Sequence, residues 1–160
     1  MFPGRSWPKG KMPTGLPVIL WDVNLWVCAF RPDSPCYGDA REVMEQDLQS
    51  QEGCIFIPNV ASSFLRLVTN PRIFVHPSDQ KEAWSFIDYI ETHPQCVYRE
   101  IDDMAFGIFK HICLVNTIAG NEVPDAFLAA AAIRYNCAFV TYDAAFNNYS
   151  GLNVRLLEHG

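Results

Sequence analysis

The sequence predicts an α/β fold, with a central, mostly parallel sheet flanked by helices. Short continuous apolar runs, which are typical of strands buried on both faces, punctuate the chain. Longer segments with apolar residues at helical spacing lie between these runs. Strands that alternate with helices favour a layered arrangement around a parallel sheet.

The predicted elements follow from these patterns and from Gly and Pro breaks. Strands are expected at residues 18–21, 54–57, 96–98 and 138–142, with an edge strand at 152–157. Helices are expected at residues 24–30, 37–51, 59–69, 78–90, 102–115 and 124–135. Ser34 with Pro35 is a start signal for the second helix, and Ser78 is the expected cap of the fourth. The helix at 124–135 is apolar nearly all round and should be buried.

Length and charge limit the organisation and the function. The 160 residues suggest one domain at 17–160, preceded by a disordered N-terminal extension at 1–16 that is rich in Gly, Pro, Lys and Arg. A formal net charge of −6 argues against a protein that coats nucleic acid through overall positive charge. It leaves a nuclease open, because a metal ion can screen phosphate locally.

The six cysteines are expected to be free thiols in a reduced, cytoplasmic protein. Cys54 and Cys137 open apolar runs, and Cys28 and Cys113 fall within helix-like segments, where a thiol acts as a small apolar group. No CxxC pair is present, which argues against a zinc site. No apolar run approaches the roughly 18 residues that span a bilayer, so no membrane segment is expected.

Three aspartates stand where a strand ends or a helix begins. Asp22 follows the run at 18–21, Asp125 lies near the start of the predicted helix at 124–135, and Asp143 follows the last central strand. Carboxylates beyond the ends of parallel strands converge, and oxygen ligands favour Mg²⁺ or Mn²⁺ over zinc. Two of them also have an ordinary explanation: Asp125 suits a helix cap and Asp143 a turn. Asp22, beside four large apolar residues, is the hardest to explain without a function.

Four motifs resemble those of PIN-domain ribonucleases, in particular the VapC toxins. The opening motif is WDVNLWV at residues 21–27, and the middle one is FLRLVTNP at 64–71. The two C-terminal motifs are NEVPDAFLAA at 121–130 and VTYDAAF at 140–146. Their order and spacing match over roughly residues 18–157.

The resemblance implies a three-layer PIN fold and a Mg²⁺- or Mn²⁺-dependent endoribonuclease. Asp22, Asp125 and Asp143 match the metal-site acids, and Asn24 matches a polar residue that supports the first of them. The family also implies an RNA substrate, a VapB-type antitoxin as partner and a homodimer. Hydrolysis by metal-activated water would leave a 5′-phosphate and a 3′-hydroxyl.

One position departs from the family pattern. The family usually has a further acid at the start of the helix after the second strand, but residues 57–63 contain no carboxylate. Asn59, Asp39 or Glu42 are alternatives for approaching the site, and so is a site with three acids. A catalytically weak PIN domain that binds RNA or protein without cutting is therefore the second hypothesis. A phosphatase with Asp22 as nucleophile is disfavoured, because Asn24 cannot act as its general acid.

Other candidate residues are expected to be structural or solvated. Arg66 and Arg72 bracket a turn and are interpreted first as ordinary surface arginines, with phosphate contact as the alternative. The aromatic residues Trp26, Trp84 and Tyr89 fall in helical patterns and are expected in the core or an interface. No catalytic role is assigned to the four histidines His76, His93, His111 and His159.

Overall fold

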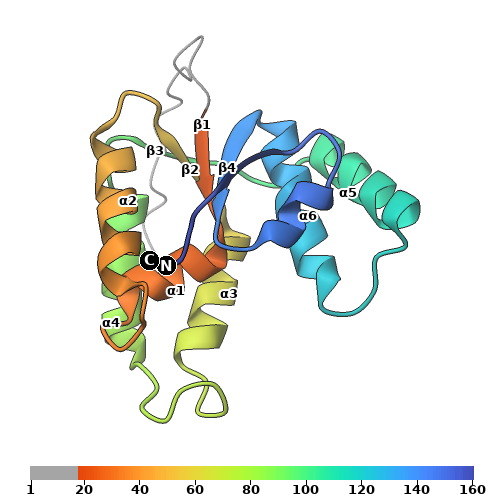
Figure 1. Cartoon of the computed structure of the whole chain (residues 1–160). Coiled ribbons are helices and arrows are strands. Elements are labelled where there is room, and N and C mark those ends of the chain that lie inside the picture. The colour runs from red at the N-terminus through yellow and green to blue at the C-terminus, as the bar shows by residue number, and fades with distance from the viewer. Residues whose placement is uncertain (1–17) are drawn as a thin grey trace, which may run out of the picture.

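The computed structural model describes residues 18–160, so the extension predicted at residues 1–16 lies outside the described part. Five strands form one sheet in the order β3-β2-β1-β4-β5, and every neighbouring pair is parallel (Figure 1). The strands are β1 (Val18–Trp21), β2 (Cys54–Phe56), β3 (Cys96–Tyr98), β4 (Cys137–Thr141) and β5 (Asn153–Leu156). The predicted α/β class with its parallel sheet is confirmed.

The pairing of β1 with β4 positions the site. Val18 is opposite Cys137 and Trp21 is opposite Val140. The carboxyl ends of the two strands therefore lie side by side, near the middle of the sheet. The peptide N–H of Asp22 donates to the carbonyl of Val140 at 2.9 Å. The residues that follow β1 and β4 are therefore held side by side, although more than a hundred positions separate them in the chain.

Helices cover the sheet on both sides. They are α1 (Val23–Phe30), α2 (Tyr37–Gln49), α3 (Pro58–Val68), α4 (Gln80–Glu91), α5 (Asp103–Asn116) and α6 (Glu122–Arg134), and a 3₁₀ turn spans Ala144–Asn148. In Figure 1, α2 and α4 lie to one side of the strands, and α5 packs with α6 on the other. All six predicted helices are present, within about two residues at most ends.

Three helix starts differ from the prediction. Cys36, rather than Ser34, precedes α2. Asp79 caps α4, with its Oδ1 accepting from the N–H of Glu82 at 2.8 Å, because the Ser78 hydroxyl is engaged by Arg31. Helix α6 begins at Glu122, two residues earlier than predicted, since a proline is tolerated in the first turn.

The main core lies between the sheet and helices α1 to α4, and Leu128, Ala131 and Ala132 of α6 also belong to it. Trp26 of α1 packs against the rings of Phe56, Phe64 and Phe86 at centroid distances of 6.0, 5.7 and 6.0 Å. These aromatic contacts join α1, β2, α3 and α4 behind the end of β1. The start of α1 therefore rests on a rigid base.

Helices α5 and α6 form a lobe with its own small core. The buried residues of this core are Ile112, Ala126, Ala129 and Ala130. Asp102 ties the two helices: it caps α5 through the N–H of Ala105 at 2.8 Å and pairs with Arg134 Nη2 at 2.8 Å. The Arg134 guanidinium and the cap lower the pKa of Asp102 below its usual range.

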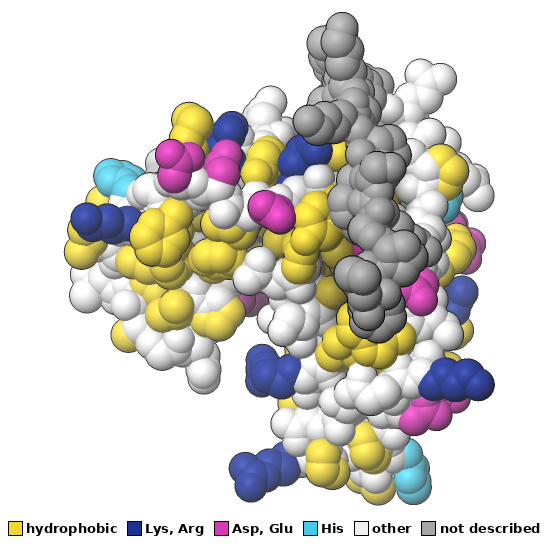
Figure 2. Space-filling view, turned by 180° about the vertical axis from the view of Figure 1, so that it is seen from behind, with side chains coloured by type: hydrophobic (Ala, Val, Ile, Leu, Met, Phe, Trp, Pro, Cys, Tyr) yellow, Lys and Arg dark blue, Asp and Glu magenta, His cyan; other side chains and the backbone are white. Residues whose placement is uncertain are grey.

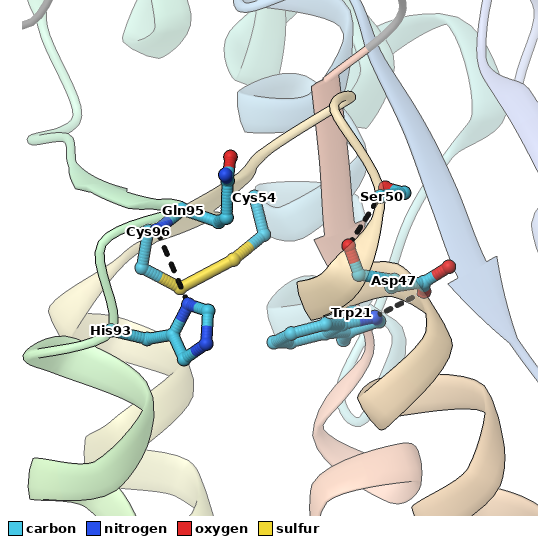
Figure 3. The surroundings of a disulfide bond; sticks show 7 residues. All are labelled: Trp21, Asp47, Ser50, Cys54, His93, Gln95 and Cys96. Atoms are coloured by element: carbon cyan, nitrogen blue, oxygen red, sulfur yellow. Dashed lines mark hydrogen bonds between the residues drawn. A yellow bond between two sulfur atoms is a disulfide. The ribbon is translucent and has the colours of Figure 1, made fainter.

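The cysteine prediction was wrong for four of the six residues. Cys28 pairs with Cys36 and Cys54 with Cys96 as disulfides, with Cα–Cα distances of 5.6 and 4.8 Å. Figure 3 shows the second bond bridging β2 and β3. Cys113 and Cys137 are free, and burial raises the pKa of the Cys137 thiol to about 12. The expectation of a reduced cytoplasmic protein therefore loses the support it took from the cysteines.

Between residues 18 and 160, no helix has the length and apolar character needed to cross a membrane.

Candidate metal-dependent nuclease site

A pocket of about 560 Å³ opens where β1 ends, between α3 and the lobe of α5 and α6. It is lined on one side by residues of α3 and on the other by apolar side chains of that lobe, including Phe109, Phe127 and Leu128. Figure 2 shows the molecule notched between two lobes, one of which carries a broad hydrophobic surface. Three of the four predicted site residues, Asp22, Asn24 and Asp125, line the pocket.

Asp22 is the most unusual of these residues. Its side chain follows β1 directly, and only 3% of the residue is exposed. The carboxylate accepts a hydrogen bond from Thr141 Oγ1 at 2.7 Å. The pKa of Asp22 is raised from 3.8 to about 6, mainly by burial and also by the charges of Asp125 and Asp143, while hydrogen bonds from the Thr141 hydroxyl and the Val23 backbone lower it. The residue is therefore a buried carboxyl group surrounded by like charge.

Thr141, the last residue of β4, couples two of the acids. It is fully buried, donates to Asp22, and accepts the peptide N–H of Asp143 on the same oxygen at 3.0 Å. Sequence reasoning missed this residue. The available signal was a hydroxyl two positions before an aspartate at the end of a buried strand.

Asp125 does not cap its helix. It lies within the first turn of α6, its residue is half-buried, and its carboxylate accepts no hydrogen bond from residues 18–160. Burial and then the charges of Asp143 and Glu122 raise the pKa of Asp125 above its usual value. The ordinary explanation by capping therefore fails for this residue.

Asp143 has a partly structural role, and Asn24 has no observed partner. Asp143 Oδ1 accepts from the N–H of Ala145 at 2.9 Å and so caps the 3₁₀ turn, as the turn explanation expected. Asp143 does not line the pocket, but its charge acts on both Asp22 and Asp125. Asn24 is exposed at the pocket, and no hydrogen bond joins its side chain to the described residues. The roles of all four residues stay predictions.

The acids share one electrostatic environment without forming a closed ligand set. Within the described part of the chain, no three His, Cys, Asp or Glu side chains are arranged to hold a metal ion by themselves. Asp22 and Asp125 both line one pocket that is large enough for water molecules. An open site of this kind offers a hard cation two or three carboxylates and leaves its other positions to water or substrate.

Helix α3 forms one wall of the pocket. Where the family usually has an acid, this wall carries uncharged polar side chains and one arginine. Asn59, Ser62, Ser63 and Arg66 line the pocket, whereas Asp39 and Glu42 do not. Of the three candidate substitutes, only Asn59 is at the pocket. The four positions follow the spacing i, i+3, i+4 and i+7 of one helix face, and this polar stripe in a largely apolar helix was the signal that could have identified the wall.

The other residues considered from the sequence lie elsewhere. Trp26 is in the core, as expected, but Trp84 and Tyr89 are 47% and 55% exposed on α4 and so do not belong to the core. The four histidines do not line the pocket.

Comparisons with known proteins agree with the motifs and the geometry. The PIN domain family model matches residues 19–152. Ribonuclease VapC31 of Mycobacterium tuberculosis is 30% identical over 136 residues, which cover 84% of this chain and 95% of the relative. Ribonuclease VapC25 of the same species is 29% identical over the same shares.

Solved structures share the fold at lower sequence identity. VapC20 of Mycobacterium tuberculosis, a toxin that cleaves the sarcin–ricin loop, matches with a TM-score of 0.62 at 14% identity, over 86% of this chain and 98% of that one. The VapBC2 complex of Rickettsia felis, bound to promoter DNA, matches with a TM-score of 0.61 at 17% identity, over 87% and 98%. From its motifs, its sheet and these relatives, the chain belongs to the PIN domain family and, within it, to the VapC ribonucleases of toxin–antitoxin systems.

Proposed function

We propose that the protein is a Mg²⁺- or Mn²⁺-dependent endoribonuclease that acts as the toxin of a toxin–antitoxin pair. One observation carries this proposal: the buried carboxylate of Asp22 has no cationic partner among residues 18–160, and the charges of Asp125 and Asp143 act on it. A fold that buries charge in this way is destabilised unless a cation is supplied from outside. The membership of the VapC ribonucleases supports RNA as the substrate.

The residues at the pocket fit a hard divalent cation. The donors are carboxylate oxygens, and no thiolate or imidazole lines this pocket. Asp22 and Asp125 are proposed as the principal ligands, because both face the pocket and both have a raised pKa. Asp143 would hold a second ion or a water molecule of the first. When bound, such an ion lowers the pKa of a coordinated water and offsets charge on the phosphate.

Groups of the protein itself orient the Asp22 carboxylate and the substrate. The Thr141 hydroxyl fixes the Asp22 carboxylate, and the β1–β4 pairing fixes both strand ends. Asn24, exposed at the pocket, is placed to donate to substrate or to a water. Attack by water on the phosphodiester breaks the P–O3′ bond and leaves a 5′-phosphate and a 3′-hydroxyl.

The test is cleavage of a mixed-sequence single-stranded RNA with Mn²⁺. We expect Mn²⁺-dependent cleavage by the wild type and a loss of at least about 100-fold with Asp22→Asn. The matched control is Asp88→Asn, because Asp88 is an exposed acid on α4 outside the pocket. Equal cleavage by wild type and Asp22→Asn would contradict the proposal.

A second candidate function has one observation in its favour. Because the α3 wall carries no carboxylate, a PIN domain that binds RNA or protein without efficient cleavage remains the alternative. Thermal unfolding with and without Mn²⁺ helps to separate the two, since a ligand at 100 times its Kd raises stability by about 2.7 kcal/mol. Mn²⁺ stabilisation with RNA binding but no cleavage would favour the alternative.

The proposed partners are a VapB-type antitoxin and a second copy of the chain. The antitoxin is suggested by the VapBC2 complex among the structural neighbours. The apolar wall of the pocket, with Phe109 and Phe127, suits an antitoxin segment that covers the acids. Four large apolar residues of α5, Met104, Phe106, Leu114 and Val115, are exposed and suit an interface. A sedimentation profile with only monomer at micromolar concentration would contradict the dimer.

A further inference from the structure

The polar wall of the pocket contains a positive charge that the fold does not use. Arg66 is exposed near the end of α3 and is the only Lys or Arg among the described residues that line the pocket. Its guanidinium makes no hydrogen bond, ion pair or cation–π contact with residues 18–160. An arginine that lines a pocket beside carboxylates and pairs with none of them has five donors available to a ligand.

The structural arginines of this chain behave differently. Arg31 pairs with Asp33 at 2.6 Å and also donates to the carbonyl of His76. Arg134 pairs with Asp102, and Arg155 with Asp47. Each of them joins two segments of the chain, whereas Arg66 joins none. Packing therefore does not account for the guanidinium of Arg66.

The charge of the site favours an anion at Arg66. Three carboxylates and one bound dication leave a net charge of minus one, and a phosphodiester adds another negative charge. No acid stands on the α3 stripe, so this wall is the side of the pocket where a phosphate meets the least repulsion. A guanidinium there can donate two parallel N–H groups to the non-bridging oxygens of a phosphate.

We propose that Arg66 binds a backbone phosphate of the RNA, so that the strand runs between the polar wall of α3 and the acids at the end of β1. This inference rests on the proposed function for the nature of the ligand. The small neighbours Ser62 and Ser63, one turn earlier on the same face, leave room for the sugar–phosphate chain.

The experiment compares Arg66→Gln and Arg66→Lys with the wild type. The matched control is Arg72→Gln, because Arg72 is an exposed arginine nearby in the chain that does not line the pocket. For Arg66→Gln we expect a loss of about 10- to 100-fold in kcat/KM for a mixed-sequence RNA with Mn²⁺. Arg66→Lys should recover part of this loss, since it keeps the charge and loses the two-pronged geometry. Unchanged unfolding midpoints establish that all variants are folded.

A binding measurement supplies a readout that a merely structural role would not change. Fluorescence anisotropy with a labelled single-stranded RNA of about 12 nucleotides is measured across a salt series, with Ca²⁺ in place of Mn²⁺ as a cation for the same oxygen ligands. One lost phosphate contact should reduce the slope of log K against log salt by about 0.7 in Arg66→Gln. Arg72→Gln should keep the wild-type slope.

The outcomes separate this inference from the proposed function. Wild-type cleavage with unchanged kcat/KM and salt slope in Arg66→Gln overturns the role of Arg66 and leaves the nuclease intact. RNA binding without cleavage by the wild type overturns the nuclease, and the salt slope then decides on Arg66 alone. If Arg66→Gln tightens Mn²⁺ binding but leaves the RNA salt slope unchanged, Arg66 serves only to offset the acids, and the inference is wrong.

Discussion

Two carboxylates are buried in the described part of the chain, and they differ in their partners. Asp47 of α2 is 7% exposed and accepts from Trp21 Nε1 at 2.7 Å (Figure 3). It also forms an ion pair with Arg155 of β5. Asp22 is 3% exposed and accepts only from the neutral hydroxyl of Thr141 among the described side chains. Trp21 and Asp22 are adjacent, so the two environments meet at the end of β1.

The difference separates a structural acid from a functional one. The charge of Asp47 is compensated inside the protein, and its contacts fasten α2 to β1 and β5. The charge of Asp22 is opposed by burial and by two more acids, so the metal-free fold is less stable for having it. A destabilising buried group that a fold retains in a pocket points to binding or catalysis.

The largest expected effect comes from removing the compensated acid. Asp47→Ala leaves the buried indole N–H of Trp21 without an acceptor and Arg155 without its ion pair. We expect a loss of about 2 to 3 kcal/mol in the free energy of unfolding, below the usual range for a buried pair because Arg155 is partly exposed to water. Urea unfolding at pH 7.5, without reductant, measures this loss.

The control for this prediction is on the same helix. Asp39→Ala removes an exposed acid of α2 and should cost less than about 0.5 kcal/mol. Similar losses for the two variants would show that Asp47 contributes no more to stability than a surface acid. The distinction between a structural Asp47 and a functional Asp22 would then be wrong.

The next prediction is a gain, rather than a loss, in the free energy of unfolding. Asp22→Asn should stabilise the metal-free protein at pH 7.5 by about 2 to 3 kcal/mol, because the pKa of Asp22 rises from 3.8 in the unfolded chain to about 6 in the fold. The folded state therefore binds more protons than the unfolded state between these values, and the wild type gains stability as the pH falls from above 6 to below 4. The asparagine variant lacks this gain.

The measurement is the difference between the two unfolding curves at several pH values, with EDTA present. Subtraction removes the contribution of other titrating groups such as Asp102. The advantage of Asp22→Asn should be present in full above pH 6 and should disappear below about pH 4. An advantage that does not change with pH would mean that packing, rather than the charge, distinguishes the variants.

The strands were more predictable from the sequence than the helix starts and the disulfides. Strands β1, β2 and β4 were predicted because each is a short, continuous apolar run between helical segments, and such a run is typical of a strand buried on both faces. Helix starts were less certain, since neighbouring residues such as Ser78 and Asp79 are both good caps and a distant arginine decided between them. The disulfide of Cys54 with Cys96 depends on the pairing of β2 with β3, which cysteine spacing does not contain.

The site was predictable where a residue conflicts with its surroundings. Asp22 conflicts with the apolar strand before it, so it was identified from the sequence. Thr141 does not, because threonine is an ordinary strand residue, and its role exists only through the β1–β4 pairing. Arg66 was interpreted as a solvated arginine, since the sequence alone does not reveal which helix face lines a pocket.

The smallest effect tests the one described side chain that donates a hydrogen bond to Asp22. Thr141→Val keeps the volume of the side chain but removes the hydroxyl that donates to Asp22 and accepts from the N–H of Asp143. We expect a loss of about 1 kcal/mol at pH 7.5 by urea unfolding, and little loss with Thr141→Ser, which retains the hydroxyl. Without that donor the pKa of Asp22 should rise further.

A double-mutant cycle with Asp22→Asn decides which bond of Thr141 matters. If the hydroxyl compensates the carboxylate, Thr141→Val should cost less in the Asp22→Asn background, where the acceptor carries no charge. If the cost is the same in both backgrounds, the hydroxyl serves mainly to hold the backbone of Asp143, and no described side chain then compensates Asp22. That result would widen the difference between Asp22 and Asp47, because no side chain of the described protein would offset the buried charge that the pocket presents to a cation.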